Sequence, residues 1–276
     1  MKFLLRILIP VFTMLITLSA RADIVVLVHG YLGSPASWDN SAISKQLQQA
    51  GWQKAGVIFD TPQGAMLRQH ATSSQNNIIY SLLLPSRAPL VHQAELLQRM
   101  ISDLEKRHPD ESIVIIGHSA GGVVARVKLV RYGAGNVSKL ITIASPHLGT
   151  GLASYALNET HSGGPVGFLK GFFGGEKYDI AKSSTPLLVD LVPARPGSFL
   201  NWLNHQPHPE IEYVSVIRGK DAALSGDSIV PGHSQDMNEV FALRGKSQRY
   251  YLPTSHGLNP LDGDFLSVLL EDNLRK

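Results

Sequence analysis

Residues 113–124 read IVIIGHSAGGVV, and this stretch decides the fold. The β-branched run at 113–116 is typical of a buried strand, and the Ala- and Val-rich run at 125–130, behind a glycine pair, is typical of the start of a helix. Ser119 therefore lies on the turn between a strand and a helix. Glycine suits positions 117 and 121, because a Cβ at either would contact the neighbouring strand or helix.

Residues 117–121 match the pattern G-x-S-x-G, in which a strained turn raises the serine hydroxyl at the end of a sheet. A match to this pattern alone also occurs by chance. The strand before it and the helix after it are the context that the motif requires, and they disfavour an ordinary exposed serine in a glycine-lined turn. The sequence thus predicts a nucleophilic serine at position 119.

Apolar runs alternate with helical stretches along the chain, which is typical of a mostly parallel sheet flanked by helices. The stretch 90–108 has apolar residues at three-to-four spacing and precedes Pro109, which predicts an amphipathic helix. A second strand is expected at 56–60; the run at 78–84 could add a strand or replace this one. The other strands are expected at 24–28, 139–144, 211–217 and 249–252, and the other helices at 38–50 and 260–274.

The first 22 residues have the features of an export signal. Lys2 and Arg6 precede a short apolar run, and Ala20-Arg21-Ala22 offers the small residues that signal peptidase needs. An uncleaved anchor is the alternative, but a membrane span needs about 18 apolar residues and Pro10 interrupts this run. We therefore expect a signal peptide at 1–22, a single domain at 23–276, and a periplasmic or secreted protein.

Composition narrows the classes of partner and cofactor. Three of the 25 basic residues lie in the expected signal, so 22 basic residues remain against 22 acidic ones. Neither this balance nor any basic stripe indicates a nucleic-acid partner. Cysteine is absent, which excludes disulfides and thiolate metal sites. No cofactor or metal is expected, since Asp262 and Asp264 alone supply too few oxygen ligands for calcium.

Further motifs extend the pattern around Ser119. They are IVVLVHGYLGSPASW at 24–38, GHSAGG at 117–122, SPHLGT at 145–150, GDSIVP at 226–231 and SHGL at 255–258. In these motifs and their order the chain resembles the α/β-hydrolases, and more narrowly the bacterial secreted lipases and esterases. The resemblance implies the α/β-hydrolase fold with a cap or lid insertion, and it covers nearly all of 23–276.

A serine nucleophile needs a histidine base and a carboxylate that orients the histidine. In this fold the partners follow in the order Ser, Asp or Glu, His. His256 is the only histidine after the last expected strand and is favoured over His233. Asp221 and Asp227 both follow the strand at 211–217, and the resemblance of GDSIVP to the acid-loop motif favours Asp227.

The resemblance also implies the remaining site residues. The backbone N–H groups of Tyr31 and Ala120 are expected to form the oxyanion hole. His29 and His118 are expected beside the turn and His147 along the pocket, so that these histidines contribute to the substrate site.

The stretch 151–209 breaks the rhythm of strands and helices and is expected to be an insertion over the sheet. Its segment 163–175, GGPVGFLKGFFGG, sets phenylalanines between glycines. Either these side chains fill a static cap, or they belong to a mobile lid in which Phe168 and Phe172 meet an acyl chain or a lipid interface.

The resemblance therefore implies a serine carboxylic-ester hydrolase of the lipase or esterase type, acting on an acyl-ester or lipid substrate through an acyl-enzyme. Phospholipase, lipid deacylase or thioesterase activity on the same residues is the alternative, since a fold fixes machinery and not substrate. A catalytically silent binding module would not need Ser119, Asp227 and His256 together.

Overall fold

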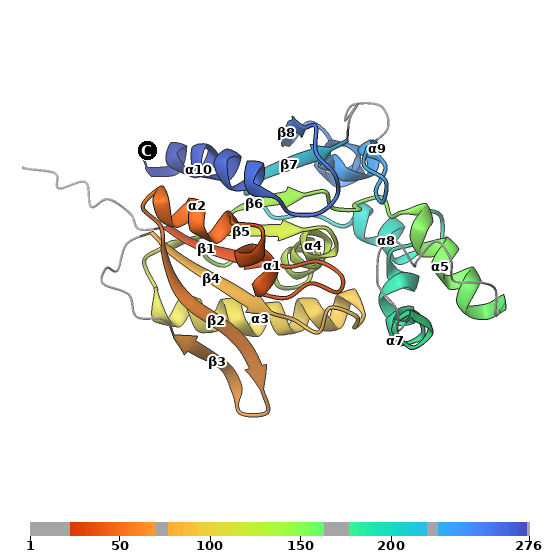
Figure 1. Cartoon of the computed structure of the whole chain (residues 1–276), viewed down its shortest axis with the longest axis horizontal. Coiled ribbons are helices and arrows are strands. Elements are labelled where there is room, and N and C mark those ends of the chain that lie inside the picture. The colour runs from red at the N-terminus through yellow and green to blue at the C-terminus, as the bar shows by residue number, and fades with distance from the viewer. Residues whose placement is uncertain (1–22, 70–76, 163–176, 220–225, 275–276) are drawn as a thin grey trace, which may run out of the picture.

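One eight-stranded sheet runs through the centre of the molecule in the computed structural model (Figure 1). The structure describes residues 23–69, 77–162, 177–219 and 226–274. The strands are β1 (Asp23–Val28), β2 (Gln53–Thr61), β3 (Gly64–Gln69), β4 (Ile78–Leu83), β5 (Ser112–His118), β6 (Val137–Ile143), β7 (Glu212–Arg218) and β8 (Ser247–Leu252).

The strand order is β3-β2-β4-β1-β5-β6-β7-β8. Every neighbouring pair is parallel except β2 and β3, which form an antiparallel hairpin at one edge. The prediction of a mostly parallel sheet is confirmed. Because all the strands except β3 are parallel, the loops that follow their carboxyl ends gather at one edge of the sheet.

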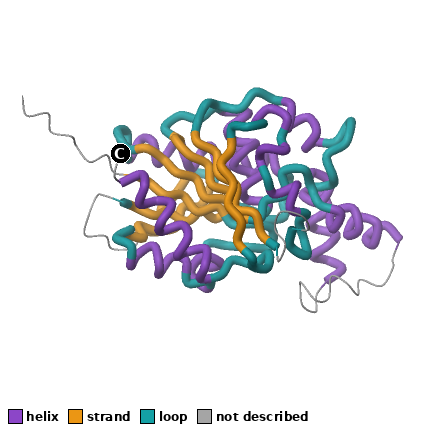
Figure 2. The backbone as a smooth tube through the Cα atoms, turned by 90° about the horizontal axis from the view of Figure 1, so that it is seen from above, coloured by secondary structure: helices purple, strands orange, loops and turns teal. Residues whose placement is uncertain are grey.

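Helices cover both faces of the sheet. Helices α1 (Ala36–Asn40), α2 (Ile43–Gln49) and α10 (Pro260–Leu274) pack on one face, and α3 (Leu90–Arg107) and α4 (Ala120–Tyr132) pack on the other. Figure 2 shows the twisted strands between these helices. Along β1, the side chains of Val25 and Leu27 pack in the core under α1, α2 and α10. Those of Val26 and Val28 pack in the core under α3 and α4. Both faces of the central strands are buried, which explains why β1 and β5 are almost entirely apolar.

One sequence prediction needs correction. The helix expected at 38–50 is divided into α1 and α2, because Ala42 takes a left-handed conformation (φ 64°) that interrupts the helix. Of the two possibilities left open for 78–84, the structure has the additional strand, since β2 and β4 are both present and pair with each other. The sequence does not predict β3, because its short apolar run, Ala65, Met66 and Leu67, lies in a mostly polar stretch and the strand depends on pairing with β2.

The region from 151 to 209 contains α5 (Gly151–Ser162), α7 (Lys177–Asp190) and α8 (Phe199–His205). α5 and α7 project together at one end of the molecule (Figure 1). The chain then passes through β7 and the short helix α9 (Gly232–Gln235), followed by two 3-10 turns, η1 (Met237–Glu239) and η2 (Phe241–Leu243). Among the described helices, none combines the length and apolar character needed to cross a membrane.

Candidate active site

Ser119 lies on the sharp turn between β5 and α4. Its backbone has φ 51° and ψ −127°, a conformation that residues other than glycine rarely adopt. The Ser119 N–H donates to the carbonyl of Ile143, at 2.8 Å, at the end of the adjacent strand β6. The turn thus projects the hydroxyl from the carboxyl edge of the sheet.

Close backbone approaches explain the glycines around this turn. A Cβ on Gly121 would lie 2.5 Å from the carbonyl oxygen of His29, so a larger residue would push β1 away from α4. A Cβ on Gly30 would lie 2.8 Å from the Cβ of Ser119. The loop after β1 therefore runs directly past the serine.

His256 connects the serine to a carboxylate. Its Nε2 lies 2.9 Å from Ser119 Oγ and its Nδ1 lies 2.9 Å from Asp227 Oδ2. The Nδ1 proton is donated to the carboxylate, which can only accept, so Nε2 is left as the acceptor for the serine proton. These three residues come from the loops after β5, β7 and β8, at one edge of the sheet.

Asp227 is fixed by four donors. Its Oδ1 accepts from the N–H groups of Ile229 and Val230, both at 2.7 Å, and its Oδ2 accepts from His256 and from Gln235 Nε2, at 3.2 Å. Burial alone raises the pKa of the carboxyl. The hydrogen bond and charge of His256, with the two backbone donors, outweigh burial and lower the pKa of Asp227 below its usual value. Asp227 is thus ionised at neutral pH.

His118 precedes the serine and supports the histidine loop. Its Nε2 lies 2.9 Å from the carbonyl oxygen of His256, which accepts only, so Nε2 carries the proton. Burial, reinforced by the charges of His256 and Arg218, lowers the pKa of His118 well below its usual value. A neutral ring that donates to the backbone orients the loop and takes no proton from the serine.

The loop after β1 brings the backbone of Tyr31 close to the turn. The Gly33 N–H donates to the Gly30 carbonyl at 3.0 Å, which folds this loop back on itself. The Tyr31 hydroxyl donates to Ser184 Oγ at 2.8 Å and ties the loop to α7. Ala120 is the first residue of α4, where N–H groups point out of the helix. The assignment of both N–H groups to an oxyanion hole stays a prediction.

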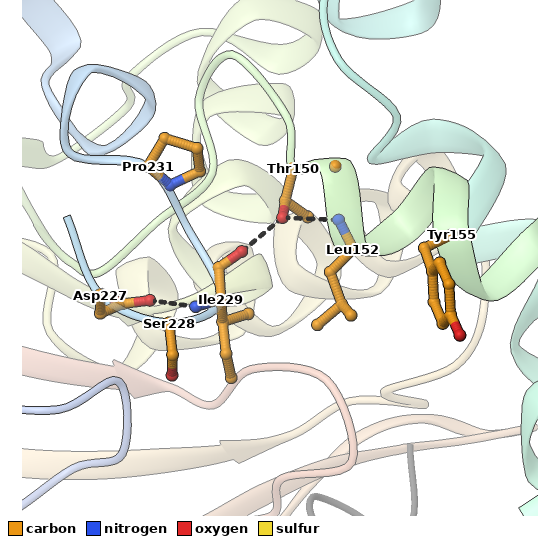
Figure 3. Close-up of a pocket in the computed structure, with 8 residues that line it drawn as sticks. Thr150, Leu152, Tyr155, Asp227, Ser228, Ile229 and Pro231 are labelled. Atoms are coloured by element: carbon orange, nitrogen blue, oxygen red, sulfur yellow. Dashed lines mark hydrogen bonds between the residues drawn. The ribbon is translucent and has the colours of Figure 1, made fainter. Parts of the chain in front are cut away.

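Two pockets of different character lie near the site, one lined in part by Asp227 and the other by His118 and Gly257. The first is about 430 Å³ and lies between the loop that carries Asp227 and the start of α5, as Figure 3 shows. Its wall is mainly apolar, with Leu152, Tyr155, Ile229 and Pro231. The Thr150 hydroxyl donates to the Ile229 carbonyl and fastens one side of the pocket to the other.

The second pocket is about 420 Å³ and lies beside the loop after β1. It is bounded by His118 and Gly257, which are sequence neighbours of Ser119 and His256. Polar side chains from α1 and the turn after it, Ser37, Asn40 and Ser41, line its far wall. The second pocket is therefore the more polar of the two, although Leu32 and Leu258 also line it.

Comparisons with known proteins agree with this architecture. Residues 20–156 match the family model described as PGAP1-like alpha/beta domain. The mature lipase BlEst2 of Bacillus licheniformis superposes with a TM-score of 0.61, at 15% identity, over 93% of each chain. A gene product of Listeria innocua superposes with a TM-score of 0.63, at 17% identity, over 91% of this chain and 94% of the other. The chain has the α/β-hydrolase fold.

Curated relatives match this chain over a short stretch. A GPI inositol-deacylase of Debaryomyces hansenii is 42% identical over 65 residues, which is 21% of this chain and 6% of the relative. The GPI inositol-deacylase B of Yarrowia lipolytica is 41% identical over 70 residues, 21% of this chain and 7% of the relative. The match thus covers a small part of the length of these proteins.

Two histidines expected in the substrate site, His29 and His147, have buried side chains. His29 donates from Nδ1 to the Gly30 carbonyl and accepts at Nε2 from the Leu84 N–H, so its ring holds loops together. His147 binds Thr142 Oγ1 and Arg126, and neither histidine is among the residues that line the two pockets. Phe168 and Phe172, like the expected signal at 1–22 and Asp221, lie outside the described residues.

Two further residues of the site carry no recognisable sequence signal. Arg218 and Gln235 are both buried, and they join the loop that carries Asp227 to the loop that carries His256. Asp262 pairs with Arg218, and Asp264 accepts a hydrogen bond from Gln46 Nε2 at 2.7 Å. Within the described part of the chain, no three His, Asp or Glu side chains gather as a metal site would require.

Proposed function

We propose that this α/β-hydrolase cleaves carboxylic esters of acyl lipids through an acyl-enzyme on Ser119. The observation that carries the proposal is the continuous chain from Ser119 Oγ through His256 to Asp227, with both hydrogen bonds at 2.9 Å. A buried carboxylate, an oriented imidazole and a serine on a strained turn together make a nucleophile of a weakly reactive hydroxyl.

In the first half of the reaction, Ser119 Oγ attacks the ester carbonyl carbon while His256 Nε2 takes the hydroxyl proton. The negative charge on the carbonyl oxygen is stabilised by the N–H groups of Tyr31 and Ala120. The imidazolium of His256, held by Asp227, then gives its proton to the leaving alcohol oxygen as the carbon–oxygen bond breaks. The product is an acyl ester of Ser119 and a free alcohol.

In the second half, water takes the place of the alcohol. His256 accepts a proton from the water as it attacks the acyl carbon, and returns this proton to Ser119 Oγ as the acyl ester breaks. The carboxylic acid leaves and the serine is restored. The same residues thus act in both halves, which matches one fixed histidine between one hydroxyl and one carboxylate.

The two pockets suggest how a lipid ester would lie. The apolar pocket lined by Leu152, Ile229 and Pro231 suits an acyl chain, because burying a methylene group contributes about 0.8 kcal/mol. The polar pocket near Ser37, Asn40 and Ser41 suits a hydroxyl-bearing alcohol. Lipid deacylation is therefore the second candidate, favoured by this polar pocket and by the names of the curated relatives.

Labelling and hydrolysis test the proposal together. A serine-directed fluorophosphonate should label the pure protein once per chain, and Ser119→Ala should abolish labelling. A chain-length series of p-nitrophenyl esters should show hydrolysis that varies with acyl length. If the parent protein neither reacts with the phosphonate nor hydrolyses any ester of the series, the proposed enzymatic function is wrong and a binding module is favoured.

Export is part of the proposal, because the signal features at 1–22 suit an enzyme that works on lipids in the periplasm or the medium. Intact-mass analysis of protein from an exporting host should give a chain that begins at Asp23. A chain that retains Met1 would contradict this.

A further inference from the structure

Arg218 is the last residue of β7, and its side chain is completely buried. Its Nη1 donates to the carbonyl oxygens of three consecutive residues: Ser255 at 2.9 Å, His256 at 2.8 Å, and Gly257. Its Nη2 forms an ion pair with Asp262, which is also completely buried. One guanidinium thus contacts the backbone on both sides of the histidine and the start of α10.

This arrangement has an electrostatic reason. Three carbonyl dipoles that converge on one point concentrate negative charge there, and Asp262 adds a full negative charge beside them. A buried carboxylate without a cation would be strongly unfavourable, so the loop conformation depends on the guanidinium. Arginine fits because its planar fork serves carbonyls with one nitrogen and a carboxylate with the other.

The backbone of Arg218 reaches the acid of the site through Gln235. The Arg218 N–H donates to Gln235 Oε1 at 2.7 Å, and Gln235 Nε2 donates to Asp227 Oδ2 at 3.2 Å. The side chain of Arg218 therefore holds the loop of His256, while its backbone is bonded to the residue that holds Asp227. The loop of His256 and the loop of Asp227 are therefore both held by hydrogen bonds that lead back to Arg218, at the end of β7.

We propose that Arg218 is a positioning residue that sets the place of His256 between Ser119 and Asp227, with Asp262 as its counter-ion. The proposal rests on the proposed function, because it assigns a role in the reaction of the same site. Catalysis depends on the Nε2 of His256 lying within hydrogen-bond reach of the serine, and a misplacement of about 1 Å costs about 10²-fold in rate.

The test compares identical substitutions at two buried arginines. Arg218→Lys keeps the charge but not the fork, and should lower kcat on p-nitrophenyl acetate by roughly 10- to 100-fold with KM unchanged. Arg126→Lys is the matched control, because Arg126 is equally buried and contacts His147, His208 and Asn204 rather than the histidine loop. It should lower thermal stability and leave kcat unchanged.

A second variant covers the case in which Arg218→Lys does not fold. The double variant Arg218→Met, Asp262→Leu removes both buried charges, and such replacements often keep a fold intact. It should remain folded, lose kcat by about 10²-fold, and show faster amide hydrogen exchange at 253–262 than the Arg126→Lys variant.

The outcomes separate the two proposals. If the parent enzyme reacts with the phosphonate and both folded Arg218 variants keep its kcat, the positioning role is overturned and the proposed function stands. If the loss of kcat follows thermal stability equally at Arg126 and Arg218, the role is also overturned. A parent without phosphonate labelling or ester hydrolysis would instead contradict the proposed function.

Discussion

The change of Asp227 to Asn tests the proposed mechanism most directly, since it alters one atom in a site with four donors. The Ile229 and Val230 N–H groups occupy Oδ1, and His256 Nδ1–H and Gln235 Nε2 occupy Oδ2. In the variant one of these positions is an NH₂ group, which cannot accept. Either the two backbone donors or the two side-chain donors lose their acceptor.

The backbone donors are fixed, so the amide oxygen should stay with them and the NH₂ group should face His256. His256 Nδ1 then has to accept, and the ring proton moves to Nε2, where it faces Ser119 Oγ and blocks proton transfer. A triad of this kind loses about 10⁴-fold in kcat when its aspartate becomes asparagine. This corresponds to about 5.4 kcal/mol in the activation free energy, at 1.36 kcal/mol for each factor of ten.

Steady-state hydrolysis of p-nitrophenyl acetate measures this loss, and circular dichroism checks that the variant is folded. Asp236→Asn is the matched control, because Asp236 is a buried carboxylate of the same region that pairs with Arg249 and not with His256. It should keep the parental kcat. A loss below tenfold in Asp227→Asn, or a larger loss in Asp221→Asn, would refute the assignment of the acid.

Three other predictions follow from the geometry. Ser119→Ala should lower kcat by about 10⁶-fold, more than the aspartate variant, with an unchanged far-UV circular dichroism spectrum. Gly30→Ala should lower kcat by about 10²-fold, because its Cβ would lie 2.8 Å from the Cβ of Ser119; parental kinetics in this variant would contradict the close approach. Burial and then Arg126 lower the pKa of His208 to about 3, so the unfolded chain binds a proton at this histidine that the folded chain does not, and stability falls as the pH decreases from about 6.5 toward 3. Urea unfolding at several pH values should show up to about 1.4 kcal/mol per pH unit from this histidine, and His208→Asn should flatten the curve.

The features that the sequence predicts are those that depend on local residue patterns and on the order of the motifs along the chain. The turn at Ser119 was predictable because glycines and a β-branched run mark it. The pairing of His256 with Asp227 was predictable because the fold brings the loops after successive strands to one edge, and the structure brings both side chains into contact.

What could not be predicted depends on contacts between distant segments. Arg218 resembles any charged residue at a strand end, and only the fold shows that three carbonyls of another loop converge on it. His147 follows a strand in a motif that suggested a pocket wall, but its ring turns toward Arg126 inside the protein. The strand β3 depends on pairing with β2, and the residues that it packs against the core, Ala65 and Leu67, are too few to mark a strand in a stretch that is otherwise polar.

The backbone of Ser119 has a consequence for selection. A non-glycine residue at φ 51° costs about 1–3 kcal/mol, a large fraction of the 5–15 kcal/mol by which a domain is stable. Glycine would adopt the same angles without this cost. A library of variants screened for heat resistance should therefore enrich glycine at position 119, whereas a screen for ester hydrolysis should retain serine. At this position the chain gives up stability for reactivity, and the two screens would measure the exchange.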